Sequence, residues 1–474
     1  TARRADKAGM AHVRDIAAAD AASLAVPLGG QDSGECRAAG RHETPLWVLK
    51  ATQLLGAAAW ACFARYINVY YSEIGMTRTQ IGILGFVSPI TSFVGTLLWG
   101  SLIDWLGEYK RTLITTQLLG TATIFLYMSA EVQGNFALVL IVTLVSNFML
   151  STGGPIVDAM CLTVLAEQNV TDEAYGDQRL WCAVGWGGMA LIAGQLIDTL
   201  GLRFMFLGFA AIQSVQIFIC VTFLPQPKPR QERDDTPEGE AEVAAAASSP
   251  GLCSFEVLWF FANLIQYGVS MSLIEGFLFV WLREDFQGTT NLLLGVATLV
   301  MCAFEVPVFK YIARLWRGEG SMTSVLFLCQ VMLIARLLLY TLLPSNLPAL
   351  VLLVEPLHGI CFAAMWAATV EYGKRIAPPG AMARFQSLVN GLYYCVSNGL
   401  GSALWGWMAE PQHLGFNGSF YLDAAFLAVW AVVWHTGVFL SRRLRQSREA
   451  PLVSTCAMPP ATAVAPSGKG ASPA

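Results

Sequence analysis

The chain has 474 residues with a formal net charge of −4, and only 13% of its residues are charged whereas 55% are hydrophobic. A soluble protein carries about 25% charged residues, so the composition excludes a soluble enzyme and a disordered chain and predicts a protein that crosses a membrane several times. The acidic balance provides no basic stripe for nucleic acid. The 11 cysteines form no CxxC pair, and we expect no disulfide framework, metal or cofactor.

Polar stretches divide the chain. Residues 1–44 and 442–474 are expected to form disordered cytosolic tails, and residues 225–253, which are rich in Pro, Glu and Ala, a disordered cytosolic linker. Between them lie two apolar blocks, 45–224 and 254–441. Each block is predicted to form a separate bundle of helices.

Each block contains six apolar runs long enough to cross a hydrocarbon core about 30 Å thick, at about 1.5 Å per residue. The expected spans are 46–71, 79–103, 112–130, 136–165, 180–199, 204–224, 255–282, 290–313, 321–343, 347–372, 384–408 and 420–441. The predicted fold class is therefore an all-α membrane protein with twelve transmembrane helices in two pseudo-symmetric six-helix bundles. Two parallel repeats of this kind are typical of transporters.

Lys and Arg indicate the orientation. They gather in the loops on the side of the two termini, for example at Lys110 and Arg111, whereas the opposite loops carry Arg78, Arg203 and Arg283. Basic loops remain in the cytosol. We therefore expect both termini to be cytosolic, in the plasma membrane or an organelle membrane.

A motif follows the second predicted span. Its residues are Gly100, Asp104, Gly107, Lys110 and Arg111. The stretch resembles the G-x-x-x-D-x-x-G-R-R loop of the major facilitator superfamily, with Trp105 in place of the usual basic residue and two residues between Gly107 and Lys110. The glycines allow close packing and a tight turn, and Asp104 can pair with the basic residues or a neighbouring helix. We expect these residues to form an inner latch.

Three further stretches narrow the resemblance. Residues 175–181, 305–307 and 358–364 are similar to the lactose-permease-like group, which includes phenylpropionate and nucleoside proton symporters and the animal "domain-containing protein 6" members. The resemblance covers about residues 46–441. It implies transport of a small solute by alternating access, usually with a proton.

Charges within predicted spans need an explanation, since a charge at the bilayer centre costs roughly 2.5–3.5 kcal/mol. Glu355 and His358 share one helix face at a spacing of three, and Arg336 and Glu305 lie at similar depth on neighbouring spans. The lactose permease is similar in its tenth and ninth helices, although His comes first there. We expect these four residues to couple protons. The alternative is a purely structural charge network that joins three helices.

Arg65 and Glu275 lie at matching depths on the first and seventh spans, which are counterparts in the two repeats and face each other in the family. We expect the pair to form an outer gate. The alternative is that each residue pairs within its own half.

Polar residues on the cavity-lining helices are candidate contacts for the solute or an ion. They are Asp158, Asn147, Asn390 and Tyr394, with Gln53, Asn68, Gln266, Tyr267, Tyr393 and Asn398 as further members. Asp158 follows a Gly-Gly-Pro kink, which frees backbone carbonyls beside a carboxylate. A salt bridge with Arg179 or Lys110 explains Asp158 equally well.

The sequence thus predicts a secondary active transporter for a small organic solute, coupled to protons. A facilitative uniporter and a non-transporting receptor or scaffold on the same fold are the alternatives. The expected partners are the solute, protons and the lipid bilayer, with the chain acting as a monomer and without nucleic acid. We expect no enzymatic activity, because the sequence lacks a nucleotide loop and a metalloprotease motif.

Overall fold

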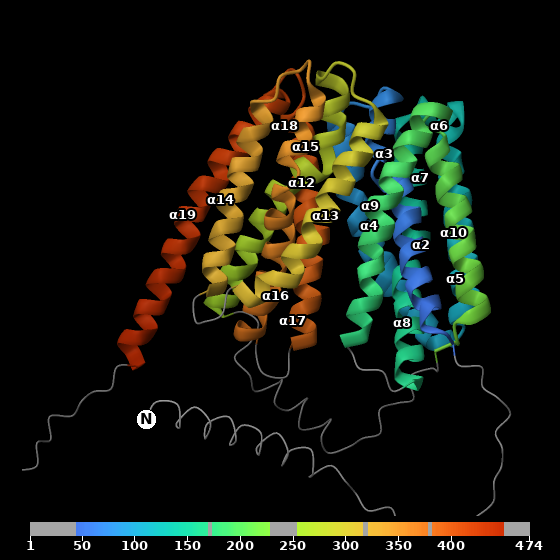
Figure 1. Cartoon of the computed structure of the whole chain (residues 1–474), viewed down its shortest axis with the longest axis horizontal. Helices are drawn as coiled ribbons and strands as arrows, with labels where there is room; N and C mark the ends of the chain where they lie inside the picture. Colours follow the sequence, from blue (N-terminus) through green and yellow to red (C-terminus); the bar gives the residue numbers. More distant parts are fainter. Residues whose placement is uncertain (1–43, 169–172, 228–253, 316–320, 378–381, 450–474) are drawn as a thin grey trace, which may run out of the picture. The chain divides into compact units, whose positions relative to one another are not determined.

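The computed structural model describes residues 44–168, 173–227, 254–315, 321–377 and 382–449 (Figure 1). Most of the two expected tails and of the linker lies outside these residues. Every regular element in the described part of the chain is helical, and the described residues belong to one compact unit.

The first half contains six spans, two of which are broken. Its helices are α2 (Leu46–Ala64), α3 (Ile67–Glu73), α4 (Arg78–Leu106), α5 (Tyr109–Phe125), α6 (Ala130–Gln133), α7 (Phe136–Leu150), α8 (Gly153–Glu167), α9 (Glu173–Leu200) and α10 (Phe204–Phe223). A turn at Arg65 divides the first span into α2 and α3, and a turn at Ser151 divides the fourth into α7 and α8.

The second half repeats the pattern with different interruptions. Its helices are α12 (Phe255–Asp285), α13 (Asn291–Leu315), α14 (Ser321–Thr341), α15 (Val351–Val354), α16 (Met365–Ile376), α17 (Met382–Asn390), α18 (Asn398–Met408) and α19 (Gly415–Glu449). Short π-helical segments, Gly359–Ala364 and Gly391–Ser397, lie within the tenth and eleventh spans.

The all-helical fold class and the order of the spans are confirmed. Within the described ranges, ten helices are long and apolar enough to cross a membrane. Helix α5 is short at 17 residues, and a π-helical segment separates α17 from α18. The last helix is longer than predicted. Residues 442–449, assigned above to the tail, continue α19 because no proline interrupts the chain before Pro451.

Glycines let the two halves approach closely on two sides. A Cβ atom added to Gly194 on α9 would collide with the Asn291 carbonyl, and one added to Gly295 on α13 with the Ala190 carbonyl. Gly406 on α18 likewise lies against the backbone of α4. Small residues permit such backbone contact between membrane helices.

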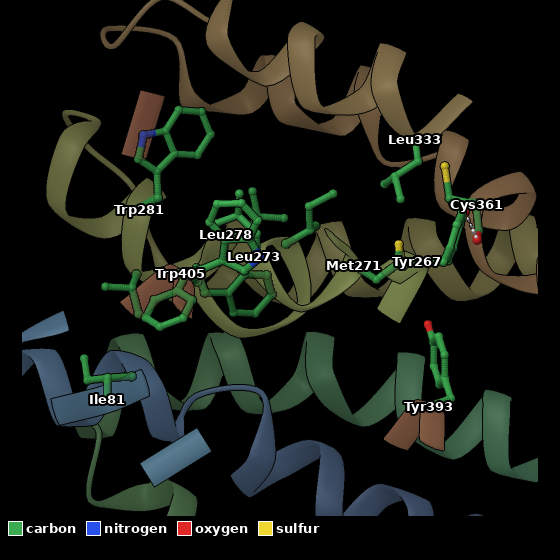
Figure 2. Packing of buried hydrophobic residues seen from close by; sticks show 14 of the residues in the cluster. Ile81, Tyr267, Met271, Leu273, Leu278, Trp281, Leu333, Cys361, Tyr393 and Trp405 are labelled. Carbon is green, nitrogen blue, oxygen red and sulfur yellow. Dashed lines mark hydrogen bonds between the residues drawn. The ribbon is translucent and has the colours of Figure 1, made fainter. Parts of the chain in front are cut away.

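The core of the second half lies around α12, which is buried along most of its length. Figure 2 shows Trp281 and Met271 on this helix, with Leu333 to one side and Tyr393 to the other. Large apolar side chains elsewhere, such as Phe218 and Val432, are exposed. A bilayer provides the apolar surroundings that such outward-facing side chains require.

Candidate functional site

A buried ion pair lies between α14 and the tenth span. Arg336 Nη2 donates to Glu355 Oε2 at 2.8 Å, and both side chains are fully buried. Tyr340, one turn further along α14, accepts from Arg336 Nε at 2.8 Å and donates to the other Glu355 oxygen at 2.7 Å. The carboxylate is therefore held on both oxygens. Tyr340 was not among the predicted site residues, although its spacing of four from Arg336 places it on the same face.

His358 connects this pair to two further carboxylates. Its Nδ1 lies 2.8 Å from Arg336 Nη1 and 3.6 Å from Glu275 Oε1. Its Nε2 lies 2.9 Å from Glu305 Oε1 on α13. The structure thus brings together the four residues predicted to couple protons. Because the ring contacts groups on three helices, a change in its protonation affects all three.

Arg65 extends the same network into the first half. At the break between α2 and α3, its Nη1 lies 3.3 Å from Glu275 Oε2 and its Nε 3.3 Å from Thr298 Oγ1 on α13. The guanidinium also lies over the Phe279 ring at 4.6 Å, a favourable cation–π contact. The predicted Arg65–Glu275 pair is present and crosses between the halves. It is continuous with the coupling residues, whereas the sequence had placed the two groups apart.

We call Arg65, Glu275, Glu305, Arg336, Tyr340, Glu355 and His358 the central network. The local backbone explains the position of its core members. Pro356 has no N–H, and the tenth span passes through a turn and a π-helical segment beside it. Such irregular turns are frequent at functional sites. Here they direct Glu355 and His358 towards α14 and α13.

Two adjoining pockets in the first half share Trp60. The larger, of about 260 Å³, is lined by Gln53, Gln117, Asp158, Trp186 and Gln213 among others. The smaller, of about 200 Å³, is lined by aromatic residues such as Phe63 and Tyr127 together with Asn68 and Asn147. Two of the four predicted solute contacts, Asp158 and Asn147, therefore face these pockets.

Asp158 is held by a neighbouring amide. Gln53 Nε2 donates to Asp158 Oδ1 at 3.1 Å. Of the predicted alternatives, Lys110 instead donates to the Val221 carbonyl at 2.8 Å, because it lies beside the end of α10. The side chain of Arg179 lies outside the described residues.

Asn390 and Tyr394 lie in the second half and line neither pocket. Asn390 donates to the Gln386 carbonyl of its own helix at 2.9 Å. Tyr394 lies against Trp366, with ring centroids 5.3 Å apart. The structure therefore separates these two predicted contacts from Asp158 and Asn147, because they lie on the eleventh span, in the other half of the molecule.

The predicted inner latch is only partly formed. Gly107 ends α4 with a φ of 67°, which confirms the tight turn. Asp104 accepts a hydrogen bond from Tyr109 at 3.2 Å, and Arg111 pairs with Glu108 at 3.3 Å. The expected close packing at Gly100 is wrong for this conformation, since a Cβ atom there would meet nothing within 4 Å.

The sequence missed a set of contacts at the end of the bundle opposite Leu46, which we call the far end. Arg78, at the start of α4, pairs with Glu284 at 2.7 Å and stacks on Phe416 at 3.9 Å. Glu410 accepts from the Thr79 backbone N–H at 2.8 Å. We call Arg78, Glu284 and Glu410 the far-end clamp. Arg78 was notable in the sequence as one of few basic residues on its side.

Solved structures with the same arrangement of helices are transporters. A crystal structure of the nucleoside transporter NupG is similar with a TM-score of 0.67 and 14% identity, over 82% of this chain and 98% of that chain. The human organic anion transporter MFSD10 is similar with a TM-score of 0.54 and 14% identity, over 84% of this chain and 100% of that one. At these identities the likeness shows the fold alone.

Helices in this order, with a charged network between two halves, define a multi-pass membrane transport protein. The family model described as the MFS_1 like family matches residues 46–420, and the chain belongs to that family. It is a transporter of the major facilitator superfamily and not an enzyme.

Curated relatives match a shorter stretch. Synaptic vesicle glycoprotein 2A of Homo sapiens and of Rattus norvegicus are each 29% identical over 157 residues, which is 32% of this chain. The match spans only 20% of the length of those relatives.

Proposed function

We propose that this transporter moves its solute together with protons, and that the central network binds the proton. The observation that carries the proposal is the charge balance of the network. Arg65 and Arg336 stay positive at any physiological pH. The network also contains three carboxylates: Glu275 pairs with Arg65, Glu355 with Arg336, and Glu305 with His358. One more positive charge balances the network.

His358 and Glu305 are the best placed to hold that proton. Glu355 is already bonded to Arg336 and Tyr340, so its charge is compensated in place. His358 Nε2 and Glu305 Oε1 lie 2.9 Å apart, so a proton between them makes a charge-assisted hydrogen bond. A buried, incompletely balanced cluster is costly, which favours proton uptake.

Arg65 couples protonation of the central network to the movement of the two halves. It reaches from the first half to Glu275, and Glu275 also faces His358 Nδ1. Protonation of His358 weakens the hold of Arg65 on Glu275, because both cations then compete for one carboxylate. A ligand shifts a conformational equilibrium only if it interacts differently with the two states. The competition for Glu275 gives the proton such a difference, and it therefore couples protonation to the conformational change.

The pockets indicate the class of solute. Among the described lining residues there is no Lys, Arg or His, whereas amides, one carboxylate and aromatic rings are present. Such a surface favours a neutral or cationic polar solute with a planar face, and it disfavours an anion. The solute class in the name of the nucleoside transporter fits this surface, whereas the anions in the name of the organic anion transporter do not.

We further propose that the chain acts as a monomer with both termini in the cytosol. The support for this orientation is the position of the basic residues. Lys110, Arg111 and Arg443 lie on the side of the termini, where positive residues collect. The far end is then the outer side, and its contacts describe an outward-closed state.

The test is uptake into proteoliposomes that contain the purified protein, with radiolabelled neutral nucleosides and organic anions as solutes. An inward proton gradient is expected to drive accumulation of the neutral solute above equilibrium, and the anions are expected not to enter. Equal uptake with and without the gradient identifies a uniporter. A protein that binds solute without moving it is a receptor.

A further inference from the structure

A second group of buried polar residues lies outside the central network, between α12 and α19. Asp423 on α19 is fully buried. Its Oδ1 accepts a hydrogen bond from Ser270 Oγ on α12 at 2.5 Å, and Ser270 in turn accepts from Gln266 Nε2 at 3.0 Å. Asp423 Oδ2 and Gln266 Oε1 have no hydrogen-bond partner. Neither the fold nor the central network explains a carboxyl group at this place.

No cation compensates Asp423 within the described part of the chain. The charged groups on the neighbouring helices have other partners: Glu275 on α12 pairs with Arg65, and Arg336 on α14 pairs with Glu355. The tyrosines on these helices are also engaged, Tyr267 with the Cys361 carbonyl and Tyr340 with Glu355. The described residues of α18 carry no ionisable side chain. An ionised Asp423 would therefore be a buried and unpaired charge, which costs several kcal/mol.

Polar side chains continue from this group along the helices towards the end of the bundle that holds the termini. Asn263 lies three residues before Gln266 on α12 and accepts from Gln330 Nε2 on α14 at 2.9 Å. Gln330 Oε1 lies 3.0 Å from Nε2 of His435 on α19, and His435 is partly exposed. We call Asn263, Gln266, Ser270, Gln330 and His435 the polar column.

We propose that Asp423 is a second proton-binding site, which takes up and releases its proton through the polar column from the side of the termini. The step is a simple acid–base equilibrium in which the carboxylate and one proton from water form the neutral acid. In the present conformation Asp423 is in the protonated, neutral form. Ionisable residues inside a membrane protein commonly mark proton pathways, and the polar column sets the side from which this one is reached. The inference does not depend on the proposed solute or on the central network.

Infrared difference spectroscopy of the purified protein in lipid, at a series of pH values in H₂O and D₂O, tests the proposal. A protonated carboxyl group has a carbonyl stretch distinct from that of a carboxylate. We expect one such band to disappear in Asp423→Asn, to shift in Ser270→Ala because its hydrogen bond is lost, and to decrease as the pH rises. Ser419→Ala is the matched control, since Ser419 is equally buried on α19 but donates only to the Gly415 carbonyl.

The route has its own measurement. Gln330→Leu interrupts the polar column and is expected to slow the exchange of the Asp423 proton with D₂O several-fold, whereas Ser419→Ala leaves the rate unchanged. An unchanged rate in Gln330→Leu overturns the route. Two further results overturn the proposal. If the band neither responds to pH nor exchanges with D₂O, Asp423 is a permanently protonated structural acid. If Asp423→Asn removes no band, Asp423 is a permanent carboxylate. If Asp423→Asn does not fold, the shift of the band in Ser270→Ala assigns the band to Asp423. A band that does not shift in Ser270→Ala also overturns the proposal.

Discussion

At the scale of single residues, the carboxylates of the central network differ in what holds them. Glu355 has one oxygen on Arg336 and the other on Tyr340, and it is fully buried. Glu305 forms an ion pair with His358, and within the described part of the chain it forms none with an arginine. The two glutamates therefore differ in their surroundings: Glu355 compensates the charge of Arg336, whereas Glu305 contacts a histidine, and the proposed function assigns to Glu305 the proton that can leave.

The first prediction separates proton coupling from solute movement. Glu305→Gln removes one negative charge, so the network is balanced without a proton. Accumulation driven by a pH gradient is expected to be lost, whereas counterflow of solute persists because it requires no net protonation change. Uptake and counterflow in proteoliposomes measure the two. Accumulation at the wild-type level would show that Glu305 does not take part in coupling.

The second prediction concerns stability. Glu355→Gln leaves Arg336 as an uncompensated buried charge and should destabilise the protein by about 3–5 kcal/mol, the usual cost of breaking such a pair. Glu305→Gln is the matched variant, and it should cost much less because no arginine depends on Glu305 alone. Thermal unfolding in detergent compares them. Equal losses in the two variants would contradict the different roles of these residues.

At the scale of elements, the halves meet through α9 against α13 and through α4 against α18. Gly194, Gly295 and Gly406 permit these contacts, since a side chain at each would meet backbone of the other half. The far-end clamp lies beside the α4–α18 contact, where Arg78 reaches Glu284 and the Ala409 carbonyl. Under the proposed alternating-access cycle, these contacts must separate when the far end opens.

The third prediction uses one of these glycines. Gly295→Val places methyl groups against the Ala190 carbonyl and should hinder closure of the far end, which lowers solute turnover and increases labelling of cysteines introduced there. Gly188→Val is the matched control because nothing lies within 4 Å of a Cβ atom at Gly188. Labelling rates that match between the two variants would show that the α9–α13 contact does not limit closure.

At the scale of the whole molecule, the Arg65–Glu275 pair joins the two halves beside the residues proposed to bind the proton. It connects the break between α2 and α3 in one half to α12 in the other. A contact that exists in one state stabilises that state. The pair and the far-end clamp therefore favour the same closed conformation from two depths.

The fourth prediction tests this pair as a gate. Arg65→Gln and Glu275→Gln should each increase the far-end-open population and raise cysteine labelling at the far end. The double variant that exchanges Arg and Glu should restore part of the wild-type balance if the side chains interact directly. Arg203→Gln is the control, as a basic residue on the same side that lies in the turn before α10. Unchanged labelling in both single variants, or no restoration by the exchange, would show that other contacts keep the far end closed.

The outcome for particular residues shows where sequence reasoning succeeded. Depth counting along helices predicted that Arg336, Glu355 and His358 meet, because helical rise is constant and intramembrane charges are few. It did not predict Tyr340, the far-end clamp or Asp423, because their roles depend on which helices pack together. Asn390 and Tyr394 were grouped with Asp158 by helix number alone, and the structure places neither of them at the two pockets of the first half.

The sequence by itself determined the membrane-spanning class, the two repeats and the transporter fold, because apolar length and charge distribution follow directly from local composition. Tertiary structure alone decided that the residues predicted to couple protons and the Arg65–Glu275 pair form one network, since side chains from the turn after α2 and from α12, α13, α14 and the tenth span converge only after the halves pack. It also decided that Asp423 meets no counter-charge among the residues that the structure describes. The physical reason is that charge compensation is a property of distances in space, which composition and helical period do not contain.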